Sequence, residues 1–103
     1  MHIQVNTDHN IDGKESTAKW VESVVEKALA RHSDQITRVE VHISDENGSK
    51  EGTRAMRCMM EARMAHRQPT SVTSDADTVD AAVNDAAGKL HRVIDNIIGK
   101  LHA

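Results

Sequence analysis

Positively charged residues recur near the C-terminal end of this sequence, and their spacing suggests contact with phosphate. A Lys-Leu-His triplet at residues 89–91 returns eleven positions later at residues 100–102, and Arg92 follows the first triplet directly. In a helix, eleven residues make about three turns, so both triplets would present the same face. Lysine and arginine along such a ridge supply point charges and forked donors for phosphate. The same pattern is also typical of a solvated helix face with cations near its C-terminus.

The histidines and the cysteine do not have the spacing of a metal site. The chain has seven histidines but no HExxH pattern, and the lone cysteine, Cys58, has no second ligand beside it. His91 and His102 lie too far apart along one helix to share an ion. We therefore expect no metal and no cofactor. Both histidines gain positive charge as pH falls, which would strengthen the ridge in acid.

The spacing of nucleophiles, bases and glycines gives no support for catalysis. No serine or cysteine has a base at local spacing, and Gly48 and Gly52 are isolated rather than part of a phosphate-binding loop. Asp8, Asp45 and Asp75 could converge at one end of a sheet, but no further residue singles them out. We expect no enzymatic activity and no small-molecule substrate.

Composition limits the class of protein. A chain of 103 residues with 38% hydrophobic residues fits one domain, residues 1–103, without an apolar run long enough for a membrane span or a signal peptide. Its net charge of -3 excludes a wholly basic nucleic-acid module but allows a local basic surface. Trp20 is the single aromatic residue, which argues against a base-stacking platform. The single cysteine and the absence of a leader favour the cytoplasm.

Apolar periodicity predicts the elements of the first half. Residues 2–7 alternate and predict a short strand, and Asp12 is the expected N-cap of a helix, with Glu15 completing a capping box. Apolar residues then recur every three or four positions until residues 32–34 end the helix. From Ile36 the period becomes two, which predicts a strand over 36–44, followed by a polar loop with a tight turn at residues 47–48.

The second half predicts two more strands and a long helix. Residues 54–65 alternate, with methionines, Cys58 and Ala62 on one face as core filler. Residues 69–73 predict an edge strand, because Pro69 donates no hydrogen bond. Asp77 is the expected N-cap of a helix that continues to the C-terminus. The opposite face of the sheet, with Glu40, His42 and Met59, lacks a covering layer and is either solvated or a partner surface.

These elements predict an α+β fold: a two-layer sandwich of order β-α-β-β-β-α, with a four-stranded mixed sheet and both helices on one face. The first two strands flank a helix and should be parallel, and the others antiparallel. The predicted core comprises Val39, Val41, Ile43, Met56, Met60, Val83, Leu90, Val93 and Ile97.

This order of elements resembles the ribosome hibernation-promoting factor family, also described as ribosome-associated inhibitors or sigma-factor modulation proteins. The resemblance rests on residues 10–12 (NID), the strand at 36–44, residues 77–83 (DTVDAAV) and residues 89–92 (KLHR). It implies a small cytoplasmic protein that binds the small ribosomal subunit in the channel for tRNA and mRNA, so that an idle ribosome cannot initiate. This chain resembles the short form, which has no dimerisation domain.

The resemblance also implies which residues contact ribosomal RNA, because the family uses basic residues on the exposed sides of its two helices. Asn96 and Ile98 stand where the family carries further basic residues, and Asp95 adds an opposing charge, which predicts weaker binding. The matching positions in this sequence are Lys89, Arg92 and Lys100 with His91 beside them, and Lys27 and Arg31 in the first helix.

Two other interpretations remain open. The same fold could serve as a protein–protein regulatory module that uses the open sheet face or the apolar end of the second helix and does not bind RNA. A weak homodimer could form through Ile94, Ile97, Ile98 and Leu101 if the fold leaves them uncovered. Salt separates these hypotheses, because RNA binding weakens as salt rises and an apolar interface does not.

Overall fold

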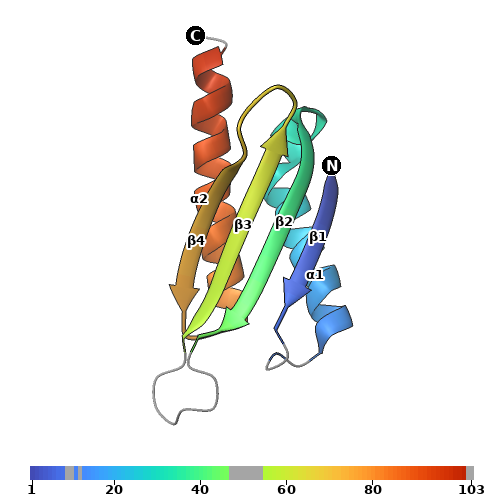
Figure 1. Cartoon of the computed structure of the whole chain (residues 1–103), viewed down its shortest axis with the longest axis vertical. Helices are drawn as coiled ribbons and strands as arrows, with labels where there is room; N and C mark the ends of the chain where they lie inside the picture. Colours follow the sequence, from blue (N-terminus) through green and yellow to red (C-terminus); the bar gives the residue numbers. More distant parts are fainter. Residues whose placement is uncertain (9–10, 12, 47–54, 102–103) are drawn as a thin grey trace.

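The computed structural model describes residues 1–8, 11, 13–46 and 55–101, and it has the predicted element order (Figure 1). A short 3₁₀ helix, η1, follows the first α-helix and was not predicted. The elements are β1 (His2–Thr7), α1 (Lys14–Leu29), η1 (Ala30–Gln35), β2 (Ile36–Asp45), β3 (Met56–Met64), β4 (Thr70–Ala76) and α2 (Val79–Leu101).

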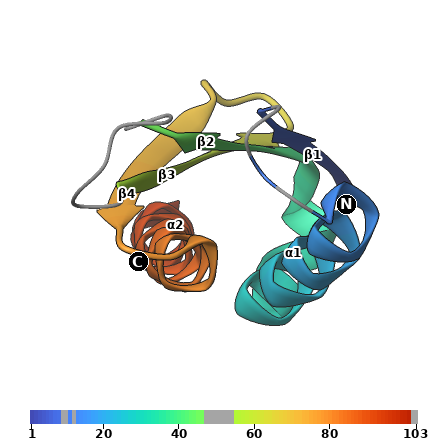
Figure 2. The same ribbon diagram turned by 90° about the horizontal axis from the view of Figure 1, so that it is seen from below.

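The four strands form one mixed sheet in the order β1-β2-β3-β4. As predicted, β1 runs parallel to β2, and the other two pairs are antiparallel. The register aligns one apolar row across all four strands, Val5, Val41, Met60 and Val72. Figure 2 shows both helices on the same side of the curved sheet, α2 beside β3 and β4 and α1 toward β1. The α+β two-layer sandwich is therefore confirmed.

The core lies between the sheet and the two helices. Six of the predicted core residues are fully buried or nearly so: Val39, Val41, Ile43, Met60, Val83 and Leu90. Met56 and Ile97 are only partly buried but pack against this core. The prediction was wrong for Val93, which is partly buried and is not part of the core cluster.

The reason is the direction of the buried stripe on α2. It runs through Leu90, Ile94 and Ile98 at intervals of four residues, so Val93 and Ile97 lie on its flank. Ile94 and Ile98 are 0% and 5% exposed, so the fold covers these two members of the predicted dimer patch. The side chain of Leu101 lies outside the described part of the structure.

Both predicted helix caps lie one position too early. Gly13, in the left-handed conformation with φ 64°, occupies the N-cap of α1, and Asp12 lies outside the described residues. At α2 the Ala81 N–H donates to Thr78 Oγ1 at 3.1 Å, so Thr78 and not Asp77 caps the helix. Aspartate and threonine are both good N-caps, and the neighbouring positions differ little by sequence alone.

Two other element boundaries differ from those predicted from the sequence. The segment predicted to end the first helix, residues 32–34, lies within η1. Strand β4 begins after Pro69 and extends to Ala76, because β3 offers pairing partners as far as Met56. The predicted turn at residues 47–48 lies outside the described residues. No helix in the described part of the chain is long and apolar enough to cross a lipid bilayer.

Candidate nucleic-acid interface

A groove between α1 and α2 brings cations of both helices together. Val24, Lys27 and Ala28 line it from α1. From α2 it is lined by Asn84, Ala87, Gly88, His91 and Arg92.

The groove combines small lining residues with positive side chains. Ala28, Ala87 and Gly88 carry little or no side chain, so an elongated group can approach the helix backbones there. The side chains of Lys27 and Arg92 are exposed, one from each helix. A phosphate placed between them would meet charge from both sides.

The structure splits the predicted ridge on α2 into two flanks. His91 faces α1, with its Nδ1 2.9 Å from the Ala28 carbonyl oxygen. Lys89 faces the sheet instead, and its Nζ donates to the Thr73 carbonyl oxygen of β4 at 2.9 Å. Lys100 follows Lys89 by about three helical turns and so shares its flank. Of the α2 residues predicted to contact RNA, only His91 and Arg92 line the groove.

Arg31, predicted to lie on the first helix, belongs to η1 and is exposed. It lies close enough to Asp95 of α2 for its charge to lower the pKa of that carboxyl group. Arg31 therefore extends the positive surface of the groove toward its η1 end without lining it.

Asp95 is held by two histidines from different parts of the chain. His32 Nε2 of η1 lies 2.6 Å from Asp95 Oδ1, and His91 Nε2 lies 3.1 Å from Asp95 Oδ2. The pKa of Asp95 is lowered first by its hydrogen bond with His32 and then by the charges of His91, His32 and Arg31, with partial burial acting in the opposite direction. The opposing charge predicted for Asp95 is therefore partly compensated by its neighbours.

The open face of the sheet has a different electrostatic character, because its arginines are paired with carboxylates. Arg38 pairs with Glu40 at 3.1 Å, and Arg63 pairs with Glu61 at 3.2 Å.

Arg57 on the same face pairs with Asp75 and with Glu46, each at 2.9 Å. The hydrogen bond and charge of Asp75, followed by the charge of Glu46, raise the pKa of Arg57. Among the described residues, no carboxylate pairs in this way with Lys27, Arg31 or Arg92. Positive charge is thus available to an external anion on the helix side.

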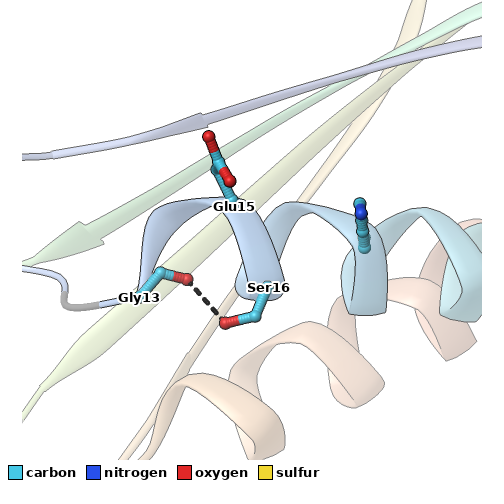
Figure 3. Close-up of a pocket in the computed structure, with 4 residues that line it drawn as sticks. Gly13, Glu15 and Ser16 are labelled. Atoms are coloured by element: carbon cyan, nitrogen blue, oxygen red, sulfur yellow. Dashed lines mark hydrogen bonds between the residues drawn. The ribbon is translucent and has the colours of Figure 1, made fainter.

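A second hollow lies at the first turn of α1 and is a weaker candidate. Gly13, Glu15, Ser16 and Lys19 line it. The Ser16 hydroxyl donates to the Gly13 carbonyl oxygen at 3.1 Å, and Glu15 points away from that bond (Figure 3). The hollow combines one acidic and one basic side chain, so it has no excess of positive charge.

The other reactive or ionisable side chains considered from the sequence are either bonded to neighbouring residues or buried. Cys58 is fully buried, and burial raises its pKa to about 12. Asp8 and Asp45 do meet at one end of the sheet, where Asp8 Oδ2 accepts the Asp45 N–H at 2.9 Å, whereas Asp75 binds Arg57. Within the described ranges, no three histidine, cysteine, aspartate or glutamate side chains are arranged so that they could hold a metal ion.

Comparison with known proteins identifies the family. The sequence pattern of the family described as "Sigma 54 modulation protein / S30EA ribosomal protein" matches residues 3–102 of this chain. The chain belongs to this family. The match covers nearly the whole sequence, so the family resemblance predicted from the residues is confirmed.

Solved structures show the same fold. The crystal structure of the Thermus thermophilus Protein Y N-terminal domain matches with a TM-score of 0.75 and 15% identity, over 94% of this chain and 99% of that one. A ribosomal subunit interface protein from Coxiella burnetii matches with a TM-score of 0.69 and 15% identity, over 96% of this chain and 99% of that one. No curated protein sequence matches the chain significantly.

The structure explains why this sequence lacks one of the positively charged residues expected from the family. Ile98, predicted to stand where the family carries a basic residue, is 5% exposed and belongs to the core. Asn96 is exposed, so that position is open to solvent but uncharged. Sequence reasoning missed the contacts of His32, because 63 residues separate it from Asp95. The four-residue spacing of His91 and Asp95 was the one local signal of this network.

Proposed function

We propose that this chain is a ribosome hibernation factor that binds the small ribosomal subunit in the channel for tRNA and mRNA and silences idle ribosomes. The observation that carries the proposal is the groove lined by Lys27 and Arg92, neither of which has a carboxylate partner among the described residues, on a chain of net charge -3. Family membership supports it, since the family description includes a ribosomal protein. The Coxiella neighbour, described as a ribosomal subunit interface protein, is consistent with it.

The mechanism follows from the chemistry of the groove. Lys27 and Arg92 would hold backbone phosphates of ribosomal RNA from two sides, and Arg92 can donate two parallel hydrogen bonds to one phosphate. His91 adds a third positive charge when it is protonated. Lys89, Lys100 and Arg31 would make contacts outside the groove and fix orientation.

Inhibition would result from occupancy of the channel alone. Residues 1–103 would act as one domain in the cytoplasm, without a cofactor, a small-molecule substrate or a membrane. No catalytic step is part of the proposal, because a bound protein in the channel excludes tRNA and mRNA sterically.

The test is co-sedimentation of the purified protein with small subunits at low and high salt. We expect binding at low salt and a steep loss as salt rises, because each phosphate contact contributes about -0.7 to -0.9 to the slope of log affinity against log salt. A Lys27→Glu, Arg92→Glu variant should fold and fail to bind. A matched control, Arg38→Glu with Arg63→Glu, makes the same change in net charge on the open sheet face and should retain binding.

The outcome also decides the alternative of a protein-binding module. Among the described residues, Met1 at 39% is the exposed large hydrophobic side chain. Met59 on the sheet face and Ile97 on α2 are half-buried. If wild-type protein never enters the ribosomal fractions, or if both double variants bind equally well, the proposal fails. A salt-independent interaction with another protein would then favour the alternative.

A further inference from the structure

His91 stands between two hydrogen-bond acceptors. Its Nδ1 lies 2.9 Å from the Ala28 carbonyl oxygen, and its Nε2 lies 3.1 Å from Asp95 Oδ2. Both partners only accept hydrogen bonds, given that the carboxyl group of Asp95 is ionised. A neutral imidazole carries one N–H and can satisfy only one of them. The geometry therefore fits the imidazolium form, in which both ring nitrogens donate.

The same carboxylate also binds His32, which joins a third element to the network. His32 Nε2 lies 2.6 Å from Asp95 Oδ1, and its side chain is only 13% exposed. His91 bonds α1 through Ala28, and Asp95 bonds η1 through His32, so the network connects α2 with both. We call His32, His91 and Asp95 the histidine clamp.

The charge of the histidine clamp changes sign with pH. With both rings protonated the three side chains are net positive, and with both rings neutral the Asp95 carboxylate leaves them net negative. The other charged groups around the clamp are Arg31 of η1, which lowers the pKa of Asp95, and the groove residues Lys27 and Arg92. Lysine and arginine remain charged over the range in which histidine titrates. The clamp is thus the variable part of this surface.

We propose that the histidine clamp is a proton-dependent positioning device that fixes α1 and η1 against α2 and strengthens RNA binding in the groove at mildly acidic pH. The inference rests on the proposed function, since the groove is the RNA site. His91 lines the groove, so its proton acts at the place where phosphate would sit. His32 and Asp95 act through His91 and through the spacing of the elements.

The direction in which stability changes with pH follows from the protonation of His91 and of Asp95. The hydrogen bonds that need a doubly protonated His91 ring are present at low pH and are lost as pH rises through the range of histidine titration. The pKa of Asp95 is lower in the folded protein than in the unfolded chain. The stabilisation that the Asp95 carboxylate contributes is therefore present above the unfolded-state pKa and is lost as pH falls through the folded-state pKa. The clamp therefore stabilises the fold most in the mildly acidic window between these limits.

The first experiment uses the free protein and does not depend on ribosomes. Nitrogen NMR of the imidazole rings at about pH 6 should show both nitrogens of His91 protonated. In urea unfolding, the stability difference between wild type and Asp95→Asn should shrink as pH rises from about 6 to about 8. A neutral His91 ring at the lower pH, or a stability difference that does not change with pH, would overturn the clamp.

The second experiment measures affinity for purified small subunits at fixed ionic strength. Wild type should bind about three- to tenfold more weakly at pH 8 than at pH 6, since uptake of one proton on binding changes affinity by at most tenfold per pH unit. His91→Gln should lose most of this dependence. The matched control is His42→Gln, which removes an exposed histidine from the open sheet face and should keep the wild-type profile.

The two experiments separate the possible failures. If His91→Gln and wild type have the same binding profile, the groove is not regulated by the clamp and the inference is wrong. If wild type binds at no pH, the proposed function fails and the binding half of the inference fails with it. The free-protein measurements then still accept or reject the clamp itself.

Discussion

Lys89 and His91, two positions apart on α2, extend to opposite flanks of the helix. Lys89 Nζ bonds the Thr73 carbonyl of β4, and His91 Nδ1 faces the Ala28 carbonyl of α1. A basic sequence run is therefore divided between two surfaces. Only the α1 side of α2 contributes to the groove, and this asymmetry has a measurable consequence.

Charge reversal on the two flanks should have unequal effects on ribosome binding. Arg92→Glu should weaken binding more than Lys89→Glu, although both make the same change in net charge, because Arg92 lines the groove and Lys89 does not. Loss of one phosphate contact should also reduce the salt slope by about 0.7 to 0.9. Salt titrations of both variants measure this, and equal losses would contradict the division of the ridge.

Truncation of Leu90 should destabilise the fold strongly. Leu90 is 0% exposed and lies at the centre of the buried stripe of α2, so Leu90→Ala should cost about 2–5 kcal/mol. Val93→Ala is the control, since Val93 is partly exposed and should cost clearly less. Urea unfolding gives both values. A cost below about 0.5 kcal/mol for Leu90→Ala, as at a surface site, would contradict the helix face assigned here.

Two glycines of α2 form a matched pair for separating stability from binding. A Cβ at Gly99 would have no neighbour within 4 Å, and one at Gly88 would lie 3.5 Å from Arg92 Nη1, which is ordinary contact. Alanine at either position should stabilise the helix by about 0.5–1 kcal/mol.

Only Gly88 lines the groove, so Gly88→Ala should also change RNA affinity whereas Gly99→Ala should not. Thermal unfolding and small-subunit binding of both variants test this pair. Destabilisation by Gly99→Ala, or equal binding by both variants, would be inconsistent with the geometry.

Cys58 should be inert toward thiol reagents in the native protein. Its side chain is fully buried, and burial raises its pKa to about 12, so the reactive thiolate is rare near neutral pH. A chromogenic disulfide reagent at about pH 8 should label it only as fast as the protein unfolds, and at once in urea. Rapid labelling of the native state would show that β3 faces solvent at this position.

Much of the fold was predictable because its signals are local and periodic. The alternation of methionine, cysteine and alanine in β3 and of valine and isoleucine in β2 fixed which face of each strand is buried. The order of strands and helices then left few ways to build two layers. The caps were less predictable, since Asp77 and Thr78 are adjacent residues that can both accept the same type of hydrogen bond.

The candidate site was predictable only in part, because it depends on contacts between distant segments. The sequence predicted cations on both helices, but not that Lys27 and Arg92 would line one groove while Lys89 binds a carbonyl of β4. The pairing of Arg57 with Asp75 of the neighbouring strand depends on register as well as on composition. These side-chain contacts are determined by the packing of the folded chain, and the periodicity of the sequence does not predict them.

The bond between Lys89 and Thr73 also bears on solubility. Strand β4 lies at the border of the sheet, where unpaired backbone groups can recruit a strand from another chain and begin aggregation. Lys89 Nζ bonds the Thr73 carbonyl of this strand and places a charged ammonium group beside it. Lys89 would thus protect the edge strand β4 from pairing with another chain. Its removal would make the protein more prone to self-association at high concentration.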